Sequence, residues 1–148
     1  MDKVYLEDLK VGDTWTSREV VMTADSIKAF AKDYDPQPFH LDEDAAKDTF
    51  FQGLAASGWH TACITMRLLV EMLPLADGLI GAEANLRWPA PTRPDDTLHV
   101  VAKITDIKPS RSKPDRAIVS WQIDTLNQNG DCAQSFGCKM LVFRRQQS

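Results

Sequence analysis

The sequence has few cysteines and no long apolar run. Its 148 residues include only three cysteines, Cys63, Cys132 and Cys138, and none of them forms the CxxC pair of zinc and redox sites. An odd number of separated thiols is typical of a reduced cytosolic protein and argues against a disulfide framework. No stretch is long and apolar enough for a transmembrane helix. The first eight residues carry acids where a signal peptide has basic residues. We therefore expect a cytoplasmic protein that does not associate with membranes.

Histidine and positive charge are also scarce. The three histidines, His40, His60 and His99, lack the spacing of metal ligands. With 17 Lys and Arg against 21 Asp and Glu, the net charge is −4, which argues against general nucleic-acid binding. Composition and length are ordinary for a globular protein with one sizeable core. We expect a single domain over residues 1–148 that binds no metal and no nucleic acid.

Apolar spacing predicts two main helices. Residues 24–34 have apolar side chains at i, i+3, i+4 and i+7, which is typical of an amphipathic helix. A second helix is expected over about 57–73, where apolar residues occupy nearly the whole circumference. Such a helix should be buried, so we assign Trp59 and Cys63 to the core, and Trp88 as well.

The second half of the chain is rich in strand patterns. We expect strands over 79–88, 97–107, 116–126 and 132–143, with an Asn-Gly hairpin signal between the last two. Residues 14–22 are also rich in β-formers. Strands that follow one another through turns predict an antiparallel sheet. The expected fold is α+β, with one buried helix against a curved antiparallel sheet.

The stretch Asp35-Pro36-Gln37-Pro38-Phe39-His40 places a carboxylate and an imidazole five residues apart in a stiff turn. Each proline drives the residue before it out of the α region. The first helix should therefore end at Tyr34 or Asp35, with His40 on an extended segment. Because His titrates near neutral pH and a carboxylate can orient it, the pair suits acid–base chemistry. A purely structural turn is the alternative, since Asp before Pro is common in turns.

The start of the second helix is a candidate binding site. Ser57 is suited to cap the helix, and a helix N-terminus presents unpaired N–H groups and a positive dipole end. Gly58 would let a ligand approach the backbone closely. A plain helix cap explains the same residues. His60, two residues further on, is expected to be a partly buried structural residue, although it lies close enough to contact a ligand.

These motifs resemble the MaoC-like dehydratase family, which includes the R-specific enoyl-CoA hydratases. The resemblance rests on Phe30-Ala31, Asp35–His40, Leu41-Asp42, Ser57-Gly58 and the later segment Leu86–Leu98. That last segment is similar to the family's aromatic-x-x-Pro-x-x-x-Gly-Asp pattern. The resemblance covers nearly the whole chain. It implies a hotdog fold, in which an antiparallel sheet wraps around a long central helix, and assembly as a homodimer or a dimer of dimers.

The resemblance also implies an activity, the reversible hydration of a 2-enoyl-CoA to a 3-hydroxyacyl-CoA. In the family the Asp and His of the motif hold and activate one water, and these roles fall on Asp35 and His40. The backbone N–H at the start of the central helix binds the thioester oxygen, a role that falls on Gly58. Either Asp35 or His40 could be the base. Coenzyme A enters only as part of the acyl-CoA substrate, and hydration needs no further cofactor.

Three positions depart from the family pattern. Gln37 replaces an Asn, Ser57 stands where His is frequent, and Asp95 replaces a Gly. Gln37 keeps an amide with a longer reach, and Ser57 leaves the following N–H intact, so both stay candidate substrate-binding residues. The basic residues that could contact coenzyme A phosphates, although a solvated surface explains each of them, are Arg87, Arg93, Lys108, Arg111 and Lys113.

Two other functions remain open. A hotdog thioesterase would hydrolyse the same class of substrate, and such enzymes generally place a carboxylate on the central helix. Glu71 is the only acid there, near the far end, where it is expected to pair with Arg67 at i, i+4. A non-catalytic acyl-CoA-binding member of the family is the second alternative.

Overall fold

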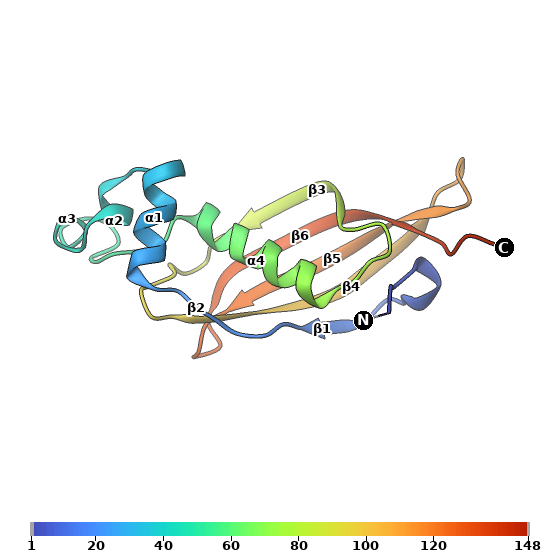
Figure 1. The fold of residues 1–148 in the computed structure, drawn as a ribbon, viewed down its shortest axis with the longest axis horizontal. Helices are drawn as coiled ribbons and strands as arrows, with labels where there is room; N and C mark the ends of the chain where they lie inside the picture. Colours follow the sequence, from blue (N-terminus) through green and yellow to red (C-terminus); the bar gives the residue numbers. More distant parts are fainter. Residues whose placement is uncertain (1, 148) are drawn as a thin grey trace.

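The computed structural model describes residues 2–147 (Figure 1). Their helices are η1 (Leu6–Asp8), α1 (Ala24–Tyr34), α2 (Pro38–Leu41), α3 (Glu43–Ala46) and α4 (Gly58–Met72). The strands are β1 (Thr14–Thr16), β2 (Val20–Val21), β3 (Ile80–Arg87), β4 (Thr97–Pro109), β5 (Arg116–Leu126) and β6 (Cys132–Phe143). They pair antiparallel in the order β1-β4-β5-β6-β3, and β2 also pairs with β4.

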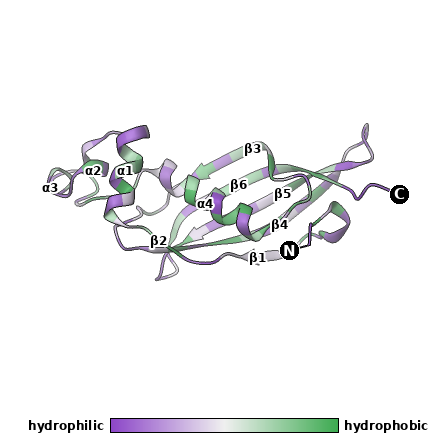
Figure 2. Ribbon diagram, in the orientation of Figure 1, coloured by the Kyte–Doolittle hydropathy of each residue, from purple (hydrophilic) through white to green (hydrophobic). Residues whose placement is uncertain are grey.

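The α4 helix lies along one face of the sheet (Figure 1). The helices α1, α2 and α3 gather beyond the N-terminal end of α4. Figure 2 shows hydrophobic residues along α4 and along the strands that it faces. The side chains of β5 alternate between buried and half-buried, as expected for a strand with one face on the core. The core joins Leu68, Leu69 and Leu73 to buried residues of the central strands, among them Val100, Ile104, Val119, Trp121 and Ile123. This arrangement confirms the predicted α+β hotdog fold.

The bounds of the main helices agree with the sequence prediction. Thr23 caps α1 by accepting the Ser26 N–H at 3.1 Å, and α1 ends at Tyr34 as expected. The segment 14–22, rich in β-formers, forms the two short strands β1 and β2. The sheet is antiparallel as predicted, and β3 pairs with β6 and not with β4, the next strand along the chain. Pairing between distant strands depends on contacts that a local pattern does not contain.

One side of α4 and almost all of β3 are exposed. The exposed fractions are 58% for Trp59, 42% for Met66, 52% for Val70 and 41% for Trp88, and Cys63 is exposed as well. The predictions that α4 is buried all round, and that Trp59, Trp88 and Cys63 lie in the core, were therefore wrong. Periodicity identifies an apolar surface, but it does not identify what covers it. Among the described residues, no helix has the length and apolar character needed to cross a bilayer.

Candidate functional site

The turn between α1 and α2 carries Asp35 and His40. Asp35 ends α1, with its N–H bonded to the Ala31 carbonyl at 2.9 Å. His40 does not lie on an extended segment as predicted; it lies on the short helix α2 and is buried. The reason is Pro38, which occupies the first turn of α2, where its fixed φ favours a helix and its missing N–H costs nothing.

The imidazole of His40 lies between a carbonyl and a carboxylate. Its Nδ1 is 2.6 Å from the Ala55 carbonyl oxygen, and its Nε2 is 3.3 Å from Asp35 Oδ2. A carbonyl oxygen only accepts hydrogen bonds, so Nδ1 carries the proton of the neutral ring. Nε2 is then an acceptor that faces a second acceptor. The two atoms cannot bond each other, but one water molecule beside both could donate to each of them.

Neighbouring groups hold Asp35 in its ionised form. Its burial disfavours the charge and raises its pKa, but hydrogen bonds from Ser57 and Gln37, and the positive charge of His40 when its ring is protonated, outweigh that effect. The pKa of Asp35 is therefore lowered from its ordinary value of 3.8. The Gln37 amide donates to Asp35 Oδ1 at 2.5 Å. The candidate substrate-binding side chain of Gln37 thus contacts the candidate acid–base pair, and Ser57 acts on the pKa of the same carboxylate.

The N-terminus of α4 begins beside the same carboxylate. Ser57 is fully buried and accepts the Trp59 N–H at 3.3 Å, which confirms it as the helix cap. No acceptor within residues 2–147 receives the N–H of Gly58. The structure thus brings Asp35, His40, Gln37, Ser57 and Gly58 together at one end of α4, with an unused backbone donor among them.

Trp88 lies against the first turn of α4. A Cβ atom added at Gly58 would be 2.7 Å from Trp88 Cε2, so only glycine fits there without displacing the ring. The indole N–H of Trp88 donates to Gln134 Oε1 at 3.0 Å. Gln134 is fully buried and donates in turn to Thr65 Oγ1 at 3.1 Å. This chain of contacts joins residues that lie far apart in the sequence, so the glycine at position 58 is its only local signal.

His60 connects α4 to α1. Its ring stacks on Phe30 with centroids 4.7 Å apart and an interplanar angle of 5°. The side chain is buried, and its Nδ1 has no hydrogen-bond partner in the described part of the chain. Burial lowers the pKa of His60 from its ordinary value of 6.5. His60 is thus more fully buried than the sequence predicts, and its purely structural role stays a prediction.

Several other predicted contacts turn out to be structural. Glu71 pairs with Arg67 at 3.3 Å as expected, but it also binds Arg18 at 2.7 Å. Arg93, a candidate for coenzyme A phosphates, instead donates to the carbonyls of Phe51, Gly53 and Leu54. No group of three His, Cys, Asp or Glu side chains within 2–147 could hold a metal ion.

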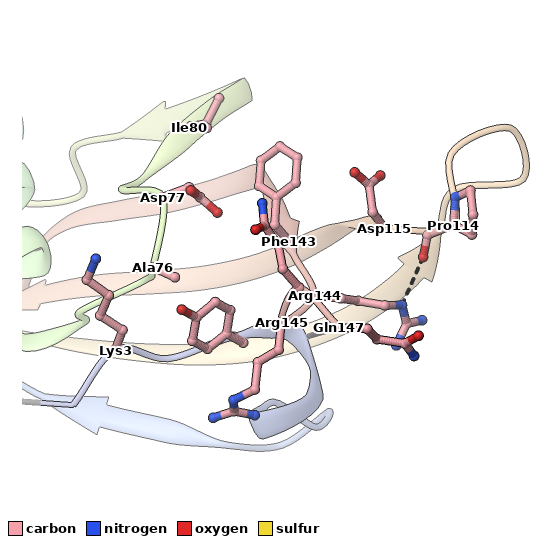
Figure 3. A pocket seen from close by; sticks show the side chains of 12 residues that line it. Lys3, Ala76, Asp77, Ile80, Pro114, Asp115, Phe143, Arg144, Arg145 and Gln147 are labelled. Atoms are coloured by element: carbon pink, nitrogen blue, oxygen red, sulfur yellow. Dashed lines mark hydrogen bonds between the residues drawn. The ribbon is translucent and has the colours of Figure 1, made fainter.

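A cavity of about 1180 Å³ lies at the opposite end of the sheet (Figure 3). Two of its arginines make bonds that hold the C-terminal segment. Arg144 donates to the Pro114 carbonyl at 3.0 Å, and Arg145 binds Asp8 at 2.7 Å. Neither Asp35 nor His40 lines this cavity. We therefore locate the candidate site by its acid–base geometry and not by cavity size.

Comparison with known proteins agrees with this geometry. The sequence profile of the MaoC like domain matches residues 10–122. An uncharacterised protein of Bacillus subtilis, YdeM, is 31% identical over 125 residues, which are 83% of this chain and 87% of that protein. The (R)-specific enoyl-CoA hydratase of Rhodospirillum rubrum is 28% identical over 107 residues, or 72% of this chain and 74% of that enzyme.

A solved structure extends the similarity to the whole fold. The crystal structure of a MaoC-like dehydratase from Rhodospirillum rubrum is 59% identical and superposes with a TM-score of 0.96, covering 97% of this chain and 99% of that chain. The family resemblance and the hotdog fold are both confirmed. The chain therefore belongs to the MaoC-like dehydratase family.

Proposed function

We propose that this protein catalyses the reversible hydration of a 2-enoyl-CoA to a 3-hydroxyacyl-CoA, as a hydro-lyase. The observation that carries the proposal is the separation of 3.3 Å between His40 Nε2 and Asp35 Oδ2. Both atoms are acceptors when His40 donates from Nδ1, so they suit one shared water. Relatives named (R)-specific enoyl-CoA hydratase and 3-hydroxybutyryl-CoA dehydratase support this class of reaction.

In the proposed reaction, the oxygen of the shared water attacks C3 of the enoyl group. One of Asp35 and His40 takes a proton from that water, and a proton is added at C2 to complete the hydration. Gln37 orients Asp35 through its hydrogen bond at 2.5 Å. In the reverse direction, the hydroxyl group at C3 and a proton at C2 leave together as water. Coenzyme A takes part only as the carrier of the acyl group, and these steps use no other cofactor.

Negative charge develops on the thioester oxygen during the attack. We place this oxygen at the N–H of Gly58, where the positive end of the α4 dipole also acts. A preorganised donor of this kind contributes roughly 3–4 kcal/mol to transition-state stabilisation. Ser57 links the two halves of the site because it caps α4 and lowers the pKa of Asp35.

The thioesterase alternative is weaker for a geometric reason. Glu71, the acid of α4, is bound to Arg18 and Arg67. It also lies 13 residues beyond Gly58 in the same helix, or roughly 20 Å along the axis at the helical rise per residue. Its carboxylate is therefore remote from the unused Gly58 N–H.

The exposed face suggests how the protein assembles. Trp59, Met66 and Val70 expose apolar surface on α4, and β3 is an edge strand with one free side. An apolar cavity of about 340 Å³ opens on this face between Met66 and β3. Exposed edges and apolar patches of this kind are usually covered, and we propose a second copy of the chain as the cover. Val70→Glu should convert the dimer to a monomer in light scattering.

An ultraviolet assay of enoyl-CoA consumption tests the function, with a panel of acyl chain lengths. Asp35→Asn and His40→Gln should each lower kcat about a hundredfold or more, the scale of a general acid–base group. Asp33→Asn and His99→Gln are matched controls outside the site and should keep the activity. Release of free thiol would instead identify a thioesterase, because hydration leaves the thioester bond intact. If acyl-CoA binds and neither signal changes, the protein is a non-catalytic binder.

A further inference from the structure

Arg93 binds three backbone carbonyls of one loop. Its Nη1 donates to the carbonyls of Gly53 at 3.1 Å and Leu54 at 3.2 Å, and its Nη2 donates to that of Phe51. No carboxylate within 2–147 lies in ion-pair contact with the Arg93 guanidinium. The side chain is half-buried. Both terminal nitrogens of this cation thus bind the loop between α3 and α4.

That loop has no regular structure of its own. Residues 47–57 are turns and irregular backbone between α3 and α4. Gln52 has a φ of 54°, a left-handed conformation that costs free energy in a non-glycine residue. The path of the loop therefore depends on contacts with other segments.

The same loop supplies the carbonyl that holds His40. Ala55 follows the three carbonyls that bind Arg93. Its own carbonyl faces His40 Nδ1 at 2.6 Å, and its N–H donates to the Phe39 carbonyl at 3.0 Å. The next residue, Ala56, donates its N–H to the Thr92 carbonyl at 2.9 Å. The segment that contains Arg93 therefore holds the loop on both sides of Ala55.

Arg93 is itself firmly placed on the sheet. Its N–H donates to Asp96 Oδ2 at 2.8 Å, and Asp96 Oδ1 accepts from Gln128 at 2.9 Å. Asp96 is buried and lies next to Thr97, the first residue of β4. A rigid strand end is thus connected to the loop through one planar side chain.

We propose that Arg93 is a positioning residue for His40, which fixes the Ala55 carbonyl and with it the tautomer and orientation of the imidazole. The inference rests on the proposed function in one respect, that His40 acts on water through Nε2. Arginine suits this role because its planar fork can serve several acceptors at once, whereas the lysine ammonium is a compact point charge. A misplacement of about 1 Å in an active site can cost about a hundredfold in rate.

The experiment compares Arg93→Met and Arg93→Lys with the wild type in two readouts. The first is the imidazole ¹⁵N spectrum, in which the Nδ1–H tautomer of His40 is identified by its loss in His40→Gln. The second is kcat and KM for an enoyl-CoA. Both variants should lose the single Nδ1–H signal of His40 and lower kcat about tenfold to a hundredfold, with little change in KM. Added guanidinium ion should partly restore both signals to Arg93→Met.

Arg144→Met is the matched control, because Arg144 also donates to a backbone carbonyl, that of Pro114, but at the other end of the sheet. It should leave the His40 spectrum and kcat unchanged. A retained Nδ1–H signal with a raised KM would overturn the proposal and make Arg93 a substrate contact. If circular dichroism shows that both Arg93 variants are unfolded, Arg93 supports the whole domain and the local role is wrong.

The two readouts also separate this inference from the proposed function. If the wild type hydrates no enoyl-CoA, the hydratase proposal fails, but the ¹⁵N spectra still test whether Arg93 controls the His40 tautomer. If the wild type is active and the spectra of the Arg93 variants match it, only the positioning role is overturned.

Discussion

The indole of Trp88 packs so closely on Gly58 that a Cβ atom at position 58 would lie between 2.7 and 3.0 Å from three of its ring carbons. The ring is held in turn by its hydrogen bond to the buried Gln134. Gly58 is therefore required for packing, independently of any role for its N–H. Loss of activity in Gly58→Ala alone would not distinguish these two requirements.

We predict that Gly58→Ala destabilises the protein by about 1–3 kcal/mol, the usual cost of overpacking. Trp88→Leu in the same chain should recover part of this loss, because the smaller side chain leaves room for the new methyl group. Urea unfolding of the two single variants and the double variant measures the coupling between the positions. If Gly58→Ala is as stable as the wild type, the ring moves aside freely and the packing requirement is wrong.

The double variant then tests the proposed thioester contact. Its backbone N–H at position 58 is intact, so a hydratase that uses this donor should regain activity along with stability. Stability without activity would mean that the indole ring, and not the N–H alone, forms part of the substrate site.

The sequence predicts the elements that depend on local signals. The bounds of α1 follow from its apolar spacing and the cap at Thr23, and α4 begins at its predicted cap, Ser57. The Asp35–His40 motif also indicates correctly that these two side chains meet. A stiff turn over six residues fixes their relative position with little help from distant parts of the chain.

Features that depend on distant segments were not predictable in this way. From the sequence, Arg93 is expected to be a solvated surface cation or a phosphate contact. Its acceptors are instead backbone carbonyls some 40 residues earlier in the chain. The partner of His40 Nδ1 is the backbone of Ala55, which leaves no side-chain signal. Trp88 reads as core because it is large and apolar, although it is 41% exposed. In each case the local pattern identifies one residue, but it does not identify which distant segment, if any, contacts that residue.

Replacing Ser57 should make stability depend on pH in a characteristic way. Ser57→Ala removes the cap of α4, which costs about 1 kcal/mol at any pH. It also removes a hydrogen bond that lowers the pKa of Asp35. A lowered pKa contributes stability above the ordinary value of 3.8, and this contribution is lost as the pH falls through the folded-state pKa. The difference between wild type and variant should therefore shrink in acid.

Thr23→Ala is the matched control for Ser57→Ala, because Thr23 caps α1 by accepting the Ser26 N–H at 3.1 Å. The free energy of unfolding that Thr23→Ala loses should be the same at neutral and acid pH. Urea unfolding at both conditions gives the two differences, and the ¹³C shift of the Asp35 carboxyl reports its pKa directly. An unchanged Asp35 titration in Ser57→Ala would contradict the role of the hydroxyl.

The backbone conformation of Asp95 explains why the MaoC-like family pattern has glycine at this position. Its φ is 69°, and its N–H donates to the Met22 carbonyl at 2.6 Å. Left-handed backbone favours glycine, and Asp tolerates it better than β-branched residues do. We expect Asp95→Gly to be neutral or to stabilise by up to about 1 kcal/mol, and Asp95→Val to destabilise by at least about 1 kcal/mol.

Thermal and urea unfolding of the two Asp95 variants check this order. Asp106→Val makes the same chemical change on exposed, extended backbone in β4, where valine is favoured. It should not destabilise the protein. If Asp95→Val is as stable as the wild type, the left-handed conformation does not constrain this position.

His60 should make the protein less stable as the pH falls. Burial lowers its pKa below 6.5, so between pH 6.5 and the folded-state pKa the unfolded chain binds a proton that the folded protein does not. Stability is therefore lost on acidification through this window, with a slope of at most about 1.4 kcal/mol per pH unit for one proton. His60→Phe keeps a ring that can stack on Phe30 but cannot titrate, so this part of the slope should disappear.

Urea unfolding at about pH 7.5 and about pH 5.5, on either side of the ordinary value, measures the change in slope. The His60→Phe substitution also removes the imidazole Nδ1, which is buried without a hydrogen-bond partner among the described residues. An unsatisfied buried polar group costs about 1–3 kcal/mol, so His60→Phe should also be more stable than the wild type at the higher pH. If His60→Phe keeps the wild-type slope, the folded protein accommodates the His60 proton as readily as the unfolded chain, and the stack on Phe30 does not depend on a neutral ring.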